Sequence, residues 1–127
     1  MQTVLSNKEG TVHGNCFWTC IASVTHIPLS EFEDYQNEKN WFPLLWDKLI
    51  KYEFEYHGGI NNLEKILDYK KGIDGYYVVD GESPRGFVRG HSVVFKDGKM
   101  VHDPHPENLG LSKIWRAHMI ERINNDL

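Results

Sequence analysis

The division of the chain into two kinds of periodicity is the feature that most constrains its fold. From residue 15 to residue 72, apolar side chains recur at intervals of three and four residues, which is the spacing of one face of a helix. From residue 75 onward, β-branched and aromatic runs are separated by glycine-containing turns, which is typical of strands. Because the two patterns are segregated along the chain, we expect an α+β fold with N-terminal helices packed on a mainly antiparallel β-sheet.

Four helices are expected in the first half, and the first two have clear boundaries. The first opens at Asn15, a residue type suited to an N-cap, and ends before Pro28. A capping-box pattern of Ser30 and Glu33 predicts a short second helix that ends near Tyr35. The first helix has an apolar stripe of Phe17, Cys20, Ile21 and Val24, and it is expected to lie against the sheet.

The third and fourth helices are predicted from proline, asparagine and glycine residues that mark where a helix starts or stops. Pro43 suits the first turn of the third helix, and the segment His57-Gly58-Gly59 is expected to break it. Asn61 or Asn62 caps the fourth helix, which ends by Gly72. The apolar residues expected to face inward are Leu45, Trp46, Leu49 and Ile50 in the third helix, and Leu63, Ile66 and Leu67 in the fourth.

The second half predicts strands joined by turns. The expected strands are 75–79, 91–95 and 100–103. Asp97-Gly98 stands between the last two and is a strong signal for a hairpin. Residues 81–86 are rich in glycine and proline and are expected to form a loop. The tail from 114 to 123 fits either a strand or a helix.

Composition limits the class of protein. The 127 residues fit a single domain spanning 1–127, and 40% hydrophobic residues is ordinary for a globular chain. The net charge is −4 and no segment concentrates lysine and arginine, which argues against a nucleic-acid partner. The apolar stretches are far shorter than the roughly 20 residues of a membrane-spanning helix. We therefore expect a cytoplasmic protein with no membrane partner, since the N-terminal segment also lacks a signal-peptide pattern.

Cys16 is the strongest candidate for a reactive side chain. It falls in the predicted first turn of a helix, where the helix dipole and the backbone N–H groups favour a thiolate. Cys20 lies within the apolar stripe of the same helix, so we expect it in the core. A bridge between two cysteines four residues apart on one helix would be strained, and both are expected to be thiols. The alternative for Cys16 is a second buried thiol with no chemical role.

Two residues of the predicted hairpin can complete a site with Cys16. His91 opens an otherwise apolar strand, where an imidazole suits a general base better than it suits packing. Asp103 lies on the partner strand, and a carboxylate there can orient the imidazole if the two share a face. The register of the hairpin decides whether they do.

Two registers are open. A strict two-residue turn pairs Lys96 with Lys99 and places Ser92 opposite Asp103. A three-residue turn with a glycine bulge instead pairs Lys96 with Met100, which makes His91 and Asp103 diagonal neighbours. We favour the second register because it adds an apolar surface for the Cys16 helix. That surface is expected to consist of Val93, Phe95 and Val101.

The candidates lie in three segments that together resemble a known superfamily. The segments are Gly14-Asn15-Cys16-Phe17-Trp18, Gly90-His91-Ser92-Val93-Val94 and His102-Asp103-Pro104. Their order, on a helix and then two strands, resembles the papain-like cysteine peptidases, and the Asp-Pro ending is similar to the branch that processes bacteriocin leaders and to small bacterial and phage relatives. The resemblance implies a papain-like fold, a peptide or protein substrate, Cys16 as nucleophile, His91 as base and Asp103 as the residue that orients it.

The sequence departs from that superfamily upstream of Cys16, where a glutamine usually helps to hold the oxyanion. Gly10 stands six residues before Cys16. Other side chains that could donate are Gln2, Ser6, Asn7 and Asn15. The backbone N–H of Cys16 can supply half of an oxyanion hole, and loss of one donor costs about 100- to 1,000-fold in rate. Arg85 is a candidate to bind a substrate carboxylate.

These residues predict a cysteine-dependent hydrolase that cleaves a peptide, isopeptide or side-chain amide bond through a thioester. Deamidation, or transfer of the acyl group to an amine, would use the same residues and stays open. The alternative is a catalytically weak or inactive papain-like protein that binds a host or partner protein. No cofactor and no metal are expected, because His102, Asp103 and His105 lack the spacing of a convergent zinc site.

Overall fold

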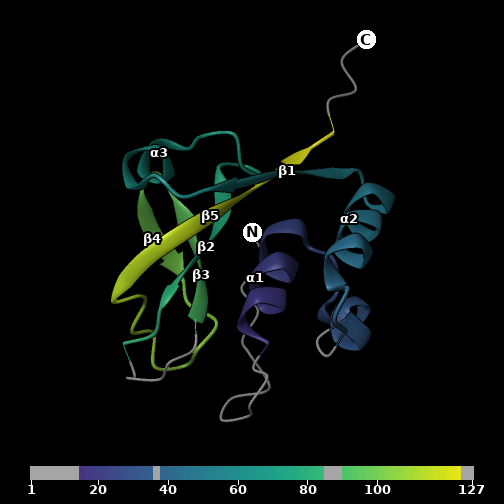
Figure 1. Cartoon of the computed structure of the whole chain (residues 1–127), viewed down its shortest axis with the longest axis horizontal. Helices are drawn as coiled ribbons and strands as arrows, with labels where there is room; N and C mark the ends of the chain where they lie inside the picture. The colour runs from purple at the N-terminus through teal and green to yellow at the C-terminus, as the bar shows by residue number, and fades with distance from the viewer. Residues whose placement is uncertain (1–14, 36–37, 85–89, 124–127) are drawn as a thin grey trace.

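The computed structural model describes residues 15–35, 38–84 and 90–123, and Figure 1 shows helices beside a twisted sheet. The helical elements are α1 (Cys16–Thr25), the 3-10 helix η1 (Leu29–Tyr35), α2 (Trp41–Lys51) and α3 (Leu63–Asp68). The strands are β1 (Phe54–Ile60), β2 (Tyr76–Glu82), β3 (Gly90–Lys96), β4 (Lys99–His102) and β5 (Lys113–Arg122). The strands form one sheet in the order β1-β5-β2-β3-β4, and every neighbouring pair is antiparallel. The expected α+β fold, with N-terminal helices on an antiparallel sheet, is confirmed.

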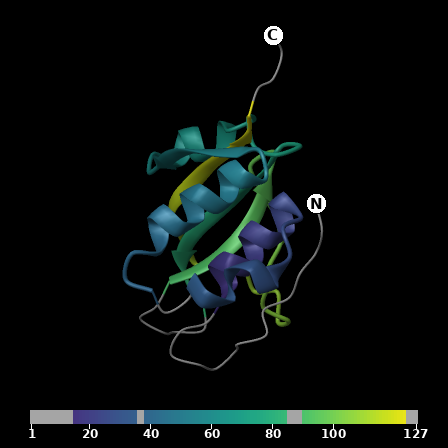
Figure 2. The same cartoon turned by 90° about the vertical axis from the view of Figure 1, so that its right-hand side faces the viewer.

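The sheet has an apolar layer on each face. Val78 and Val94 pack in a cluster with the apolar side of α1, and Val79 and Val93 pack in a second cluster with Ile66 of α3. This follows from the period of two in a strand, which sends successive side chains to opposite faces. Seen from the side in Figure 2, α1 and α2 lie together on one side of the sheet. The described part of the chain has no helix long and apolar enough to cross a membrane.

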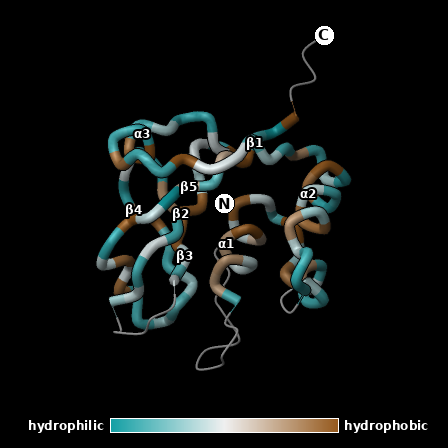
Figure 3. Tube along the Cα trace, in the orientation of Figure 1, coloured by the Kyte–Doolittle hydropathy of each residue, from teal (hydrophilic) through white to brown (hydrophobic). Residues whose placement is uncertain are grey.

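Helix α1 is almost wholly buried, and its sequence explains how it tolerates this. In Figure 3 its trace is mostly white to brown, which marks residues of intermediate to high hydropathy. Its buried hydroxyls at Thr19, Ser23 and Thr25 each donate a hydrogen bond to the carbonyl oxygen four residues earlier, at 2.6–2.8 Å. Each buried hydroxyl is therefore satisfied within the helix itself. The helix ends at His26, which takes a left-handed conformation, shortly before Pro28.

Several expected helical features are corrected by the structure. The second helix is a 3-10 helix that begins at Leu29, so Ser30 is not its N-cap. In α2 the side chains of Leu45 and Leu49 are buried, as expected, but Trp46 and Ile50 are 42% and 47% exposed. The packed stripe of α2 is therefore narrower than the sequence pattern. In α3, Asn62 caps the helix by accepting from the Lys65 N–H, Ile66 is buried, and Leu63 and Leu67 are exposed.

The strands also extend beyond the expected limits. His57-Gly58-Gly59 does not simply end a helix, because it lies within β1, where Gly58 has a positive φ next to a shift in register. Strand β2 continues through Gly81 to Glu82, into the segment expected to be a loop. The ambiguous tail is strand β5, which lies between β1 and β2.

The hairpin of β3 and β4 contains a bulge, but not at the expected glycine. Asp97 and Gly98 both have positive φ, and Lys96 pairs with Lys99, so the turn is the strict two-residue form. The extra residue is Val101 on β4, because Phe95 pairs with Met100 while Val94 pairs with His102. The predicted three-residue turn is therefore wrong. The bulge at Val101 still shifts the pairing of β3 and β4 by one residue, nearer to Asp103 than expected.

The expected apolar surface for the Cys16 helix is also wrong. Val93 and Phe95 pack on the α3 side of the sheet, and Val101 is 45% exposed. The residues that face α1 are Val78 and Val94, one strand position away. The prediction assumed that His91, Val93 and Phe95 all share the face of the sheet that contacts the Cys16 helix. His91 instead lies near the start of β3, at the end of the sheet.

Candidate active site

Cys16 is the first residue of α1 and is partly exposed. The residue before it, Asn15, occupies the N-cap position, but its side chain makes no capping hydrogen bond. The carbonyl of Asn15 does begin the helix, since it accepts from the Thr19 N–H at 2.8 Å. The sulfur is thus placed at the positive end of the helix dipole, as the sequence predicts.

His91 contacts both of the other candidate residues. Its Nε2 lies 2.7 Å from Oδ1 of Asp103, and both side chains are buried. Because the carboxylate can only accept, Nε2 is the donor and Nδ1 is left for Cys16. Burial lowers the pKa of His91, but hydrogen bonds and charge interactions with Asp103 and Cys16 outweigh it and raise the pKa to about 9. The site therefore favours a protonated imidazole beside the sulfur.

Asp103 is held rigidly by the chain that follows β4. Its Oδ1 also accepts from the His105 N–H at 2.9 Å, and its Oδ2 accepts from the Gly110 N–H at 2.8 Å. Burial raises the pKa of Asp103, but the hydrogen bonds from His91 and these two N–H groups hold it below its usual value. A carboxylate with three donors remains charged and cannot rotate freely, so it fixes the plane of the imidazole.

The second cysteine has a different environment. Cys20 is fully buried, and burial raises its pKa well above that of an ordinary thiol, with the negative charge of Cys16 adding to the rise. It is a protonated packing residue, as its place in the apolar stripe indicates. The structure thus brings Cys16, His91 and Asp103 together and leaves Cys20 in the core.

The remaining predicted site residues divide into two groups. Asn15 is buried directly before Cys16. Gln2, Ser6 and Arg85 lie outside the described residues. Among the residues that the structure does describe, no group of three or more His, Cys, Asp or Glu side chains is arranged to hold a metal ion.

A second histidine–aspartate pair lies on the same sheet and was missed by the sequence analysis. His118 Nε2 is 2.6 Å from Oδ2 of Asp80, and His118 Nδ1 is 2.8 Å from the Tyr56 hydroxyl. Ser92 donates to Oδ1 of Asp80 at 2.7 Å, and Arg116 Nε is 3.3 Å from Oδ2. Burial raises the pKa of Asp80, but these partners outweigh it and hold the pKa below its usual value.

This second cluster is connected to the first through α1 and β3. The Phe17 ring, next to Cys16, packs on the His118 ring with centroids 5.0 Å apart. Ser92 directly follows His91. The pairing of Asp80 with Ser92 could have been found only with the correct register of β2, and His118 only with the tail assigned as a strand.

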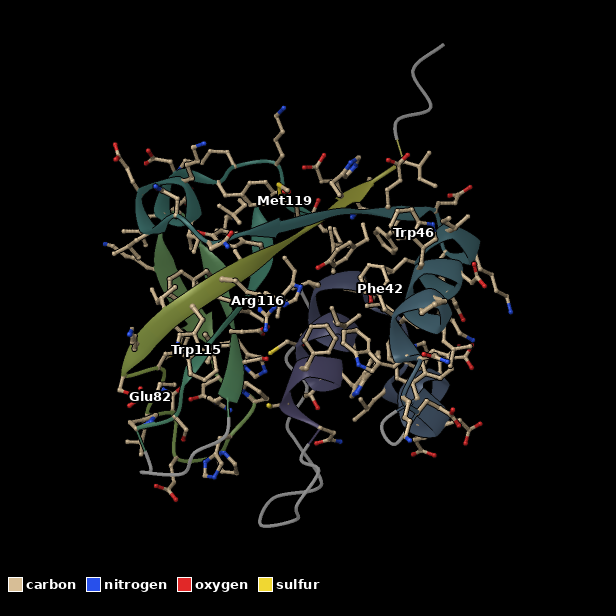
Figure 4. The ribbon with its side chains drawn as sticks, in the orientation of Figure 1. Phe42, Trp46, Glu82, Trp115, Arg116 and Met119 are labelled. Carbon is tan, nitrogen blue, oxygen red and sulfur yellow. The ribbon has the colours of Figure 1, made fainter. Side chains whose placement is uncertain are left out.

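A hollow lies beside the second cluster. It has a volume of about 270 Å³ and is lined by Gly59, Asn61, Trp115 and Arg116. Figure 4 shows Trp115 and Arg116 next to each other on β5, apart from Phe42 and Trp46 on α2. The sequence analysis named none of these four lining residues as a site.

Comparisons with protein-family models, with curated proteins and with solved structures returned no match to this chain. The function of the chain must therefore follow from the chemistry of its residues, above all from the helix-tip thiol, the buried imidazole and the fixed carboxylate.

Proposed function

We propose that the chain is a cysteine-dependent hydrolase of the papain-like type, acting on a peptide, isopeptide or side-chain amide bond. One observation carries the proposal. His91, fixed by Asp103 at 2.7 Å, has its pKa raised to about 9 partly by its contact with Cys16. A protonated imidazole that interacts with a sulfur at a helix N-terminus is the resting state of an activated cysteine nucleophile.

In the first half of the proposed reaction, the Cys16 thiolate attacks the carbonyl carbon of the amide. The carbonyl oxygen becomes an oxyanion, and backbone N–H groups at the start of α1 stabilise it. The imidazolium of His91 gives its Nδ1 proton to the leaving nitrogen, so the C–N bond breaks and an amine departs. The acyl group stays on the sulfur as a thioester.

In the second half, neutral His91 removes a proton from water, and the resulting hydroxide equivalent attacks the thioester carbonyl. The C–S bond breaks, a carboxylic acid leaves, and the thiolate–imidazolium pair is restored. Asp103 does not exchange a proton in either half. It keeps Nε2 protonated and the ring in plane, so that Nδ1 faces the sulfur throughout.

The alkylation of Cys16 as a function of pH tests this proposal. The rate of reaction with iodoacetamide is measured between pH 5 and pH 10, with the modified residue identified by mass spectrometry. An ordinary thiol is almost fully protonated below pH 7 and reacts slowly there. We expect Cys16 to react at pH 6 with a large part of its maximal rate, and His91→Ala to lose most of that reactivity.

Cys20→Ala is the matched control, because it removes a buried thiol from the same helix and keeps Cys16. Its profile should equal that of the unmodified chain. If Cys16 instead follows the profile of a simple thiol in all three proteins, the hydrolase proposal is wrong and the binding-protein alternative gains. A panel of peptide aldehydes and glutamine-mimetic electrophiles then distinguishes an endopeptidase from an amidase by which compound forms the Cys16 adduct.

A further inference from the structure

The hollow beside Trp115 adjoins the candidate catalytic residues. A Cβ atom built on Gly90 would lie 2.8 Å from the Trp115 ring, so the indole packs directly on the residue before His91. Arg116 pairs with Asp80 across β5 and β2, and Asp80 pairs with Ser92 across β2 and β3. The hollow and His91 therefore lie at the same end of the sheet.

The backbone spacing sets the scale of the site. One strand separates β5 from β3, and neighbouring strands are about 4.8 Å apart, so Arg116 and Ser92 are separated by roughly 10 Å. An extended peptide covers about 3.5 Å per residue. His91 is next to Ser92 in the chain and contacts Cys16, so a peptide bound at Cys16 can reach Arg116 with a residue about two or three positions from the reacting carbonyl.

Arg116 is anchored by one edge of its guanidinium. Its Nε is 3.3 Å from Oδ2 of Asp80, and the side chain remains 58% exposed. A guanidinium has five N–H donors, so a contact through Nε leaves both terminal nitrogens able to donate. Asp80 is itself held by Ser92 and by the buried His118, which fixes the direction in which Arg116 projects.

The lining residues together indicate the chemistry of a ligand. A planar guanidinium with two terminal nitrogens matches a carboxylate, which it can bind through two parallel hydrogen bonds. Trp115 is 39% exposed and offers an apolar ring for the methylene groups beside such a carboxylate. Asn61 can add an amide donor on the other side of the hollow.

We infer that Trp115 and Arg116 form a subsite that binds a carboxylate of the substrate, about two or three residues from the bond attacked by Cys16. The inference rests on the proposed function, because it assumes that a substrate reaches Cys16. The carboxylate can be an acidic side chain or the C-terminus of a peptide. Both have the same chemistry, and the experiment distinguishes them.

N-chloroacetyl peptides are the probes, because they alkylate Cys16 without requiring turnover. Three matched series are used, with the variable group placed one, two or three residues from the chloroacetyl carbon. The first series has glutamate and an amidated C-terminus, the second has glutamine and an amidated C-terminus, and the third has glycine and a free C-terminal carboxylate. Each second-order labelling rate is divided by the iodoacetamide rate of the same protein.

We expect a peptide with a carboxylate at the second or third position to label Cys16 about tenfold faster than the glutamine peptide of the second series. Preference for the first series identifies an acidic side chain, and preference for the third identifies a C-terminal carboxylate. Arg116→Gln should abolish the preference. Arg116→Lys keeps the positive charge but loses the two parallel hydrogen bonds of the guanidinium, so it should retain only a small part of the preference. This variant replaces Arg116→Gln in the test if the glutamine variant does not fold.

Arg122→Gln is the control, because Arg122 is an equally exposed arginine on β5 that pairs with Asp74. It should leave the preference unchanged. Equal labelling by charged and neutral peptides, or a preference that survives Arg116→Gln, would overturn the subsite. Failure of iodoacetamide to label Cys16 at pH 6 would instead count against the proposed hydrolase, so the two failures are separable.

Discussion

At the scale of single residues, the sheet contains two histidine–aspartate pairs with different third partners. The pair of His91 and Asp103 meets a thiol, whereas the pair of His118 and Asp80 meets a phenol and a guanidinium. The hydrogen-bond distances within the two pairs are nearly equal, 2.7 and 2.6 Å. The chemistry available to each pair is therefore set by its neighbour: a thiol in one case and an anchored guanidinium in the other.

Asp103→Asn tests the role assigned to the carboxylate. The asparagine amide keeps the shape but loses the charge, and its NH₂ group must face one of the N–H donors of His91, His105 or Gly110. We expect the pKa of His91 to fall below about 9, since the charge and hydrogen bond of Asp103 both raise it. A ¹⁵N NMR titration of the ring measures this directly. An unchanged His91 pKa would contradict the proposed orientation.

The three residues of the candidate site were predictable from the sequence, and the second cluster was not. Cys16, His91 and Asp103 each stand at a local boundary, namely a helix start, a strand start and a residue before proline. Such boundaries can be read one segment at a time. The contact of Asp80 with His118 joins β2 to β5, which depends on long-range pairing that a single sequence does not show.

At the scale of elements, strand β2 is the connection between the two clusters. Its neighbours are β3, which provides His91, and β5, which provides Arg116. The register of β2 against β5 shifts between Asp80 and Gly81, which leaves Trp115 as the extra residue. This bulge brings Trp115 next to Gly90 and Arg116 next to Asp80, so one irregularity places both residues of the proposed subsite.

Gly81→Ala tests whether the close approach of β2 to β5 at this bulge requires a glycine. A Cβ atom at Gly81 would meet the backbone oxygen of Lys113, and a backbone atom cannot move aside as a side chain can. We expect a loss of about 1–3 kcal/mol in the free energy of unfolding, measured with urea. Gly59→Ala in β1 is the comparison, since its Cβ would be 3.5 Å from the oxygen of Ala117, an ordinary contact. Equal losses in both variants would show that the crowding at Gly81 is not important.

The elements that sequence reasoning misplaced share one physical cause, which is tertiary context. The glycines of β1 have low strand propensity, but Gly59 pairs with His118 of β5, and Gly58, with its positive φ, lies at the shift in register. Trp46 and Ile50 fit the apolar stripe of α2, yet they stay exposed at the margin of the contact, whereas Leu45 and Leu49 are buried at its centre. Periodicity shows which side chains can face inward, and the width of the contact decides which of them do.

At the scale of the whole molecule, the charge state of the site affects the stability of the fold. The folded pKa of His91 is above its unfolded value of 6.5, so the protonated ring stabilises the folded state fully below about pH 6.5. This contribution is lost as the pH rises through about 9. The pKa of Asp103 is lowered instead, so its contribution is present above its unfolded value and is lost as the pH falls through its folded pKa.

These opposite dependences predict a measurable slope of stability with pH. These slopes are measured in Cys16→Ser, where no thiol titrates with the imidazole. Between pH 6.5 and 9, its free energy of unfolding should fall as His91 loses its proton, because Asp103 still raises the pKa of His91. Urea unfolding at half-unit steps of pH measures it. Adding His91→Gln removes the titrating ring, and the curve of the double variant should be flatter over the same interval. If the two curves have the same slope, Asp103 does not hold His91 protonated in the folded state, and the role assigned to the carboxylate is wrong.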